Sequence, residues 1–142
     1  MALSSWQFWA LLSAAFAALT AIFAKIGVSG INPDFATLIR TIVILALLFA
    51  IVAATGQWQA PSEVSARSWI FLMLSGLATG ASWLCYFRAL KLGDAARVAP
   101  LDKMSIVLVA LFGVAFLGER LSVANWIGIA LCTAGIVLIA LR

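Results

Sequence analysis

Five apolar segments, each long enough to cross a lipid bilayer, occupy nearly all of the 142 residues. An α-helix rises about 1.5 Å per residue, so about 20 apolar residues cross a hydrocarbon core of about 30 Å. An odd number of crossings predicts that the two ends of the chain lie on opposite sides of the membrane. The expected fold class is therefore all-α, an integral membrane protein with five transmembrane helices and no soluble domain.

The composition supports this prediction, because apolar residues make up 65% of the chain, charged residues make up 10%, and the mean hydropathy is +1.17. These values lie outside the range of soluble globular proteins. The net charge of +4 arises from basic residues that stand singly at the ends of apolar segments. Such residues orient a chain in a membrane, so no nucleic-acid partner is expected. Cys85 and Cys132 fall inside apolar spans, which predicts buried thiols rather than a disulfide.

The expected helices cover about 6–26, 33–54, 68–90, 95–117 and 122–141, within a single transmembrane domain over residues 1–142. Asn32 and Ser122 are expected to cap the second and fifth helices, and Gly56 follows the end of the second. Pro100 removes one backbone hydrogen bond, so it is expected to kink or restart the fourth helix. The first segment could instead be a cleaved signal peptide, but no Lys or Arg precedes it and its apolar run is too long.

The distribution of basic residues predicts an orientation. If side A is the side of the N-terminus, side A carries Arg67 and Arg120. The basic residues expected on side B are Lys25, Arg88, Lys91, Arg97 and Arg142. The positive-inside rule then makes side B cytoplasmic, with the N-terminus outside and the C-terminus inside. The bias is modest, so a mixed orientation stays open.

Residue types that carry enzyme chemistry are scarce. The chain has no histidine, and its five acidic residues fall mostly in separate turns. It also lacks the GxSxG and HExxH motifs and paired CxxC spacing. No catalytic residue, metal site or cofactor is expected, and the chain is not expected to be an enzyme.

A transporter needs polar groups at membrane depth. Arg40 lies about two turns inside the second helix, where its guanidinium could hold an anionic or carbonyl group. Snorkelling of the same side chain to the nearby interface is the alternative, and both interpretations stay open. Lys25 stands at the very end of the first helix, where snorkelling is the simpler interpretation.

Asp102 and Lys103 form a second candidate site. If the fourth helix begins at Ala95, both residues lie about two turns inside the membrane and need a partner, such as Arg40 or a substrate. If the helix effectively begins at Pro100, they are capping charges at headgroup level. The sequence leaves both possibilities open.

The third helix carries two neighbouring stripes of residues. Ser75, Thr79, Ser82 and Tyr86 share one face, and Gly76, Gly80, Trp83 and Phe87 run beside it. Small residues at this spacing more often pack against other helices, whereas Trp83 and Tyr86 could line a pocket. On the fifth helix Gly128, Cys132 and Gly135 predict a surface for helix or subunit packing.

The C-terminal sequence also resembles a known family. Its characteristic words are Gly93-Asp94-Ala95, Val98-Ala99-Pro100-Leu101, Leu117-Gly118-Glu119-Arg120 and a glycine-rich last helix. They resemble the second half of an EamA domain, the repeat unit of the drug/metabolite transporter superfamily. The chain resembles the small five-helix bacterial and archaeal group, although Ser105 stands where many two-domain members have proline.

The resemblance implies a transporter of small metabolites or drug-like compounds in a bacterial or archaeal cytoplasmic membrane. It further implies alternating access, often outward, by two such units in opposite orientation. An antiparallel homodimer is the first expectation, and a parallel homodimer or a separate partner chain stays open. Cavity charges at Lys25, Arg40 and Lys103 favour neutral, zwitterionic or anionic substrates. The alternative function is a membrane subunit that does not transport and packs through its glycine stripes.

Overall fold

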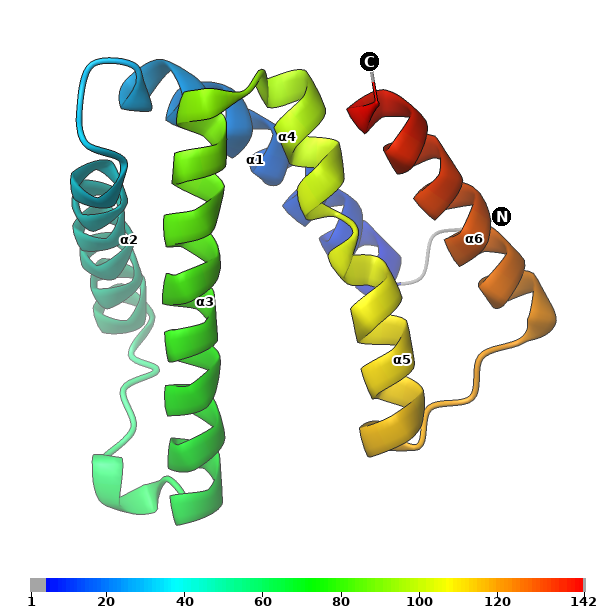
Figure 1. The fold of residues 1–142 in the computed structure, drawn as a ribbon. Helices are drawn as coiled ribbons and strands as arrows, with labels where there is room; N and C mark the ends of the chain where they lie inside the picture. The colour runs from blue at the N-terminus through cyan, green and yellow to red at the C-terminus, as the bar shows by residue number, and fades with distance from the viewer. Residues whose placement is uncertain (1–4, 142) are drawn as a thin grey trace. The chain divides into compact units, whose positions relative to one another are not determined.

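The computed structural model describes residues 5–141. Its helices, shown in Figure 1, are α1 (Ser5–Val28), α2 (Pro33–Thr55), η1 (Pro61–Glu63), α3 (Ala66–Leu92), α4 (Ala95–Asp102), α5 (Ser105–Leu117) and α6 (Val123–Ala140). These described residues contain no strand. Five segments are long and apolar enough to cross a membrane when α4 and α5 count as one. The all-α fold with five membrane-spanning segments is therefore confirmed.

The helix ends follow local sequence signals. Asn32 caps α2, because its side chain accepts hydrogen bonds from the backbone N–H groups of Asp34 and Phe35. Ser122 caps α6 and forms a capping box with Asn125. The residue after α2 is Gly56, which has a left-handed φ of 65° that a residue with a Cβ adopts only at a cost.

The expected fourth helix is interrupted, and the interruption follows Pro100 rather than coinciding with it. Pro100 lies inside α4, and the α-helical pattern stops at Lys103 and Met104 before α5 begins. The N–H groups of Lys103 and Met104 donate to the carbonyls three residues earlier, those of Pro100 and Leu101. Such bonds mark a tighter turn of 3₁₀ type. The bond that Pro100 lacks would reach the carbonyl of Ala96, on the N-terminal side, where α4 stays helical. The break lies one turn after the proline instead.

The structure divides into two compact units, which we describe separately. The central unit comprises Ala24–Leu92, where α2 and α3 run side by side (Figure 1). Its buried residues come from the end of α1, the start of α2 and the end of α3: Ala24, Val28, Ala36, Thr37, Phe87 and Leu90. The outer unit comprises the described residues before Ala24 and after Leu92, and in it α6 packs against α4 and α5.

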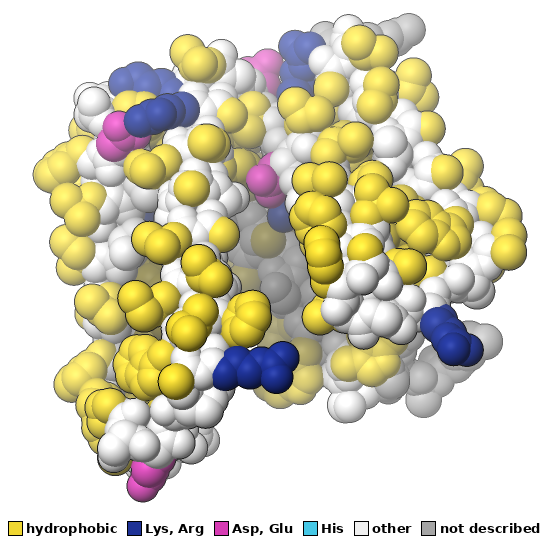
Figure 2. Space-filling view, turned by 60° about the horizontal axis from the view of Figure 1, so that its bottom comes forward, with side chains coloured by type: hydrophobic (Ala, Val, Ile, Leu, Met, Phe, Trp, Pro, Cys, Tyr) yellow, Lys and Arg dark blue, Asp and Glu magenta, His cyan; other side chains and the backbone are white. Residues whose placement is uncertain are grey.

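Most large apolar side chains are exposed, and hydrophobic side chains are spread over the whole face shown in Figure 2. Such a surface is what a lipid-facing protein needs. Cys85 and Cys132 share it: both are free thiols and both are exposed, so the expectation that they are buried was wrong. An apolar span places a residue in the membrane, but it does not say whether lipid or another helix covers that residue.

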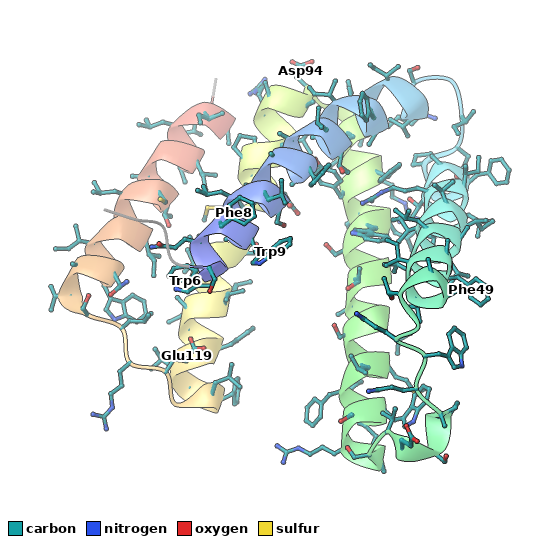
Figure 3. All side chains as sticks on the ribbon, turned by 180° about the vertical axis from the view of Figure 1, so that it is seen from behind. Trp6, Phe8, Trp9, Phe49, Asp94 and Glu119 are labelled. Carbon is teal, nitrogen blue, oxygen red and sulfur yellow. The ribbon has the colours of Figure 1, made fainter. Side chains whose placement is uncertain are left out.

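Aromatic side chains gather at the start of α1, where Figure 3 shows Trp6, Phe8 and Trp9. The rings of Phe8 and Trp9 meet edge to face, with their centroids 5.5 Å apart. Amphipathic rings at the end of an apolar helix commonly lie at headgroup level. This cluster is suited to anchor the first turns of α1 at the membrane surface.

Candidate substrate-binding site

The centre of the candidate site is Arg40, which α2 carries two turns after its start at Pro33. The side chain is half-buried, and its guanidinium carbon lies 4.1 Å from the centre of the Trp83 ring. The Phe87 ring lies 5.6 Å away. Trp83 and Phe87 are four residues apart in α3, so one face of that helix presents both rings to Arg40.

Arg40 is engaged by rings rather than by a carboxylate. Among the described residues the ion pairs are Asp34–Arg88 and Asp102–Lys103, and neither includes Arg40. Arg40 also donates no hydrogen bond to a described residue. A guanidinium has five N–H donors in its plane and can bind a carboxylate or phosphate through its edge while a ring covers one face. The arrangement is therefore suited to bind an anion.

Three other basic residues of the central unit form bonds near its helix ends. Arg88 forms a two-pronged pair with Asp34, with Nε 3.0 Å from Oδ1 and a terminal nitrogen 2.8 Å from Oδ2. The Nζ atom of Lys25 donates to the carbonyl of Leu90 at 2.7 Å, and that of Lys91 donates to the carbonyl of Ile31 at 2.8 Å. These bonds join the end of α1, the start of α2 and the end of α3.

Lys25 was a candidate for the cavity, with snorkelling as the simpler alternative. The structure shows it half-buried and bonded to the last turn of α3, 65 residues along the chain. A lysine near the C-terminal end of a helix can stabilise the carbonyls that lack partners in the helix. In this arrangement Lys25 fastens two helices together.

The hydroxyl stripe of α3 does not gather around Arg40 as a group. The hydroxyl of Thr79 donates to the carbonyl of Ser75 in its own helix, and Ser82 is exposed. Tyr86 is half-buried, with its ring 6.5 Å from that of Phe87. Of the candidates on α3, Trp83 is the one whose ring lies against the guanidinium of Arg40. Phe87 was not among those candidates, although its position four residues after Trp83 was a signal for it.

The glycine stripes are not in close contact with other helices. A Cβ atom added at Gly76, Gly80, Gly128 or Gly135 would meet no atom within 4 Å. Cys132, in the α6 stripe, is exposed. The helix packing predicted for these residues is therefore absent within the described part of each unit, and a packing partner would have to come from elsewhere.

In the outer unit, α4 begins at Ala95 with Asp94 in the N-cap position. The helix thus starts where the first possibility for Asp102 and Lys103 requires, but Asp102 is its last residue and Lys103 follows it. Their depth in the membrane stays a prediction. The Nζ atom of Lys103 is 3.2 Å from Oδ2 of Asp102, and both side chains are exposed. Nearby, Arg97 donates to the carbonyl of Ala140 at the end of α6.

Comparison with known proteins identifies the family. The profile of the EamA-like transporter family matches residues 4–141. The chain belongs to the EamA-like transporter family. This confirms the resemblance found in the sequence and makes the EamA-like chain an integral membrane protein of a transporter family.

Two curated relatives agree with this assignment. The EamA-like chain is 75% identical over 136 residues to an uncharacterized transporter in the cobO 3′ region of a Sinorhizobium species, covering 96% of each chain. It is 30% identical over 90 residues to the probable 4-amino-4-deoxy-L-arabinose-phosphoundecaprenol flippase subunit ArnE of Proteus mirabilis. That match covers 63% of this chain and 80% of the relative. No solved structure shows significant similarity.

Proposed function

We propose that this EamA-like protein is one subunit of a metabolite exporter that works by alternating access, and that Arg40 binds the anionic group of the substrate. The observation that carries the proposal is the guanidinium of Arg40, held by Trp83 and Phe87 inside a membrane-spanning helix. A charge at this depth is costly without a partner. Carboxylates and phosphates are the partners that a guanidinium binds best.

The substrates expected are neutral, zwitterionic or anionic rather than cationic. An arginine without a carboxylate neighbour attracts anions and repels organic cations. The substrate named for the Proteus relative contains a phospho group, which is an anion that a guanidinium can bind bidentately. Arg40 is the residue that would contact such a group in this protein.

The working assembly that we propose is an antiparallel homodimer in the cytoplasmic membrane. Two five-helix units in opposite orientation give a pathway that can open to either side. On the glycine faces of α3 and α6, a Cβ atom added at each glycine would meet no atom of another described element within 4 Å, so these faces are available to a second subunit. The word "subunit" in the name of the Proteus relative describes a protein that works in an assembly.

More basic residues are expected on side B than on side A, which argues against dual orientation. The argument is weaker than the number of these residues implies. Three of these residues donate to a backbone carbonyl. Lys25 donates to Leu90 and Arg97 to Ala140, both at helix ends. Lys91 donates to Ile31, in a loop. A basic residue that satisfies a carbonyl has a structural reason to be at that position in either orientation. The positive-inside rule nevertheless counts such a residue as evidence for a cytoplasmic side.

Transport by purified protein in proteoliposomes tests the role of Arg40. We expect uptake of amino acids or organic acids to exceed that of a quaternary ammonium compound, and Arg40→Ala to abolish it while the protein remains folded. Arg67→Ala is the matched control, because Arg67 faces the ring of Phe71 at 5.9 Å at the start of α3. Equal transport of the quaternary ammonium, with none of the acids, would contradict the proposal.

The same variants test the alternative function. A subunit that only packs against other membrane proteins would show no flux, and Arg40→Ala would leave its assembly unchanged or prevent assembly altogether. The orientation is tested in cells by a tag after the C-terminal residue. Reaction of the tag on both membrane faces supports an antiparallel pair, and reaction on one face alone refutes dual orientation.

A further inference from the structure

The interruption between α4 and α5 carries a pair of opposite charges. Asp102 is the last residue of α4, and Lys103 is the next residue. Since α4 begins at Ala95, Asp102 lies about 11 Å along the helix axis from its start. The whole segment Ala95–Leu117 has the length and hydropathy of one membrane crossing. The pair therefore lies inside the membrane-spanning segment rather than at its end.

The pair is poorly covered by its own unit. The side chain of Lys103 is 64% exposed and that of Asp102 is 37% exposed. Charged side chains at membrane depth are almost always turned toward the protein interior or a water-filled cavity. This face of the interrupted helix therefore requires water or a polar partner, and lipid supplies neither.

The bond between the two residues leaves the carboxylate with unused capacity. The ammonium of Lys103 reaches Oδ2 of Asp102 at 3.2 Å. A carboxylate accepts about four hydrogen bonds, and an ammonium on a flexible four-carbon stem can turn away from it. A second ammonium can take the position of Lys103 on this carboxylate. When the incoming compound also carries an anionic group that pairs with the displaced Lys103, the exchange adds no net charge to the site and leaves no single buried charge.

We propose that Asp102 binds a primary ammonium group of the transported compound and that Lys103 occupies this position while the compound is absent. When Lys103 is displaced, its own ammonium can bind a carboxylate or phosphate of the same compound. The ligand class is therefore a zwitterion with a primary ammonium group. The proposal rests on the proposed transport function only in describing the ligand as a transported compound. Binding of the ligand can be measured without transport.

The test uses the full chain in lipid nanodiscs, with Cys85 and Cys132 changed to alanine because both thiols are exposed. A cysteine at Ser105, three residues after Asp102 and also exposed, reports on the site. A cysteine at Leu131, eight residues after the start of α6, is the control for lipid-facing positions. A charged thiol reagent that does not enter lipid should modify Ser105→Cys readily and Leu131→Cys hardly at all.

Ethylammonium is the first ligand probe, and γ-aminobutyrate is the zwitterionic one. Both should slow modification of Ser105→Cys, whereas tetramethylammonium, which has no N–H donor, should not. Asp102→Asn should remove the protection. If Lys103 occupies Asp102 in about nine of ten molecules, Lys103→Gln should strengthen protection by ethylammonium about tenfold.

A pair with only a structural role gives different results. Equal reactivity at Ser105→Cys and Leu131→Cys, or protection that neither substitution changes, would overturn the proposal. If Lys103→Gln fails to fold, the neutral variant Asp102→Asn/Lys103→Gln replaces it, and it should show no protection where the parent protein does. None of these measurements depends on flux, so they can succeed even if Arg40→Ala leaves transport unchanged.

Discussion

Trp83 offers the sharpest test of how Arg40 is held. Its ring lies 4.1 Å below the guanidinium of a half-buried arginine. Cation–π contacts contribute from about 0.5–1 kcal/mol at exposed sites to about 2 kcal/mol when desolvated, so about 1.5 kcal/mol is a reasonable value here. Trp83→Leu keeps an apolar side chain but removes the ring. The guanidinium is then able to turn toward the interface.

The expected consequence is a loss of substrate affinity. A difference of about 1.4 kcal/mol corresponds to tenfold in binding, so KM should rise by about tenfold in Trp83→Leu. The maximal rate should change less, because Trp83 positions the binding residue and need not touch the substrate. Trp83→Phe keeps a ring and should restore part of the affinity. Concentration-dependent uptake into proteoliposomes measures both quantities.

The control is Phe71→Leu, which removes the ring that faces Arg67 at 5.9 Å. Both residues of that pair are exposed, so the contact is weak, and KM should stay within experimental error of the parent value. An unchanged KM in Trp83→Leu would refute the argument that the ring holds Arg40 for the substrate. An equal rise in both variants would refute it as well, because the effect would then not depend on Arg40.

Three further predictions concern stability in detergent, measured by thermal unfolding. Asp34→Arg or Arg88→Asp alone should lower the melting temperature, and the exchanged pair should recover much of the loss, because the two-pronged bond can form in reverse; no recovery would show that the pair contributes nothing. Lys25→Met should lower the melting temperature by freeing the carbonyl of Leu90, and an unchanged value would mean that this bond is replaced by water. Gly118→Ala should destabilise the protein by about 1 kcal/mol because Gly118 has a φ of 68°, whereas Gly128→Ala, with open space at its Cβ, should not; equal effects would contradict this explanation.

The helix ends were predictable because their causes lie within a few residues. Asn32 and Ser122 cap helices through bonds to backbone groups two or three positions away. Gly56 ends α2 in the conformation that glycine adopts most readily. Pro100 predicted a disturbance in the fourth span at the proline itself. The break in the helix lies about one turn later in the sequence. The turn after a proline depends on how the next residues bond, which a single residue does not specify.

The candidate site was predictable in part. Arg40 and Trp83 could be named because a charge and a large ring inside apolar spans are rare enough to notice. Phe87 was placed in the same stripe as Trp83 but was not named as a candidate for the site. Thr79 and Ser82 were named, although small residues at their spacing were expected to pack against other helices more often than to line a pocket. Two stripes on one helix differ only by a rotation about its axis. Which of them faces a neighbour is decided by packing, and packing is not a local property of the sequence.

The sequence by itself determined the membrane location, the five spans, the helix caps and the family, because hydropathy and short motifs are read along one dimension. Only the tertiary structure decided that α3 turns Trp83 and Phe87 toward Arg40. It also decided that Lys25 bonds to the carbonyl of Leu90, 65 residues away. The physical reason is that every turn of a helix offers several faces, and the contacts made by its neighbours select among them.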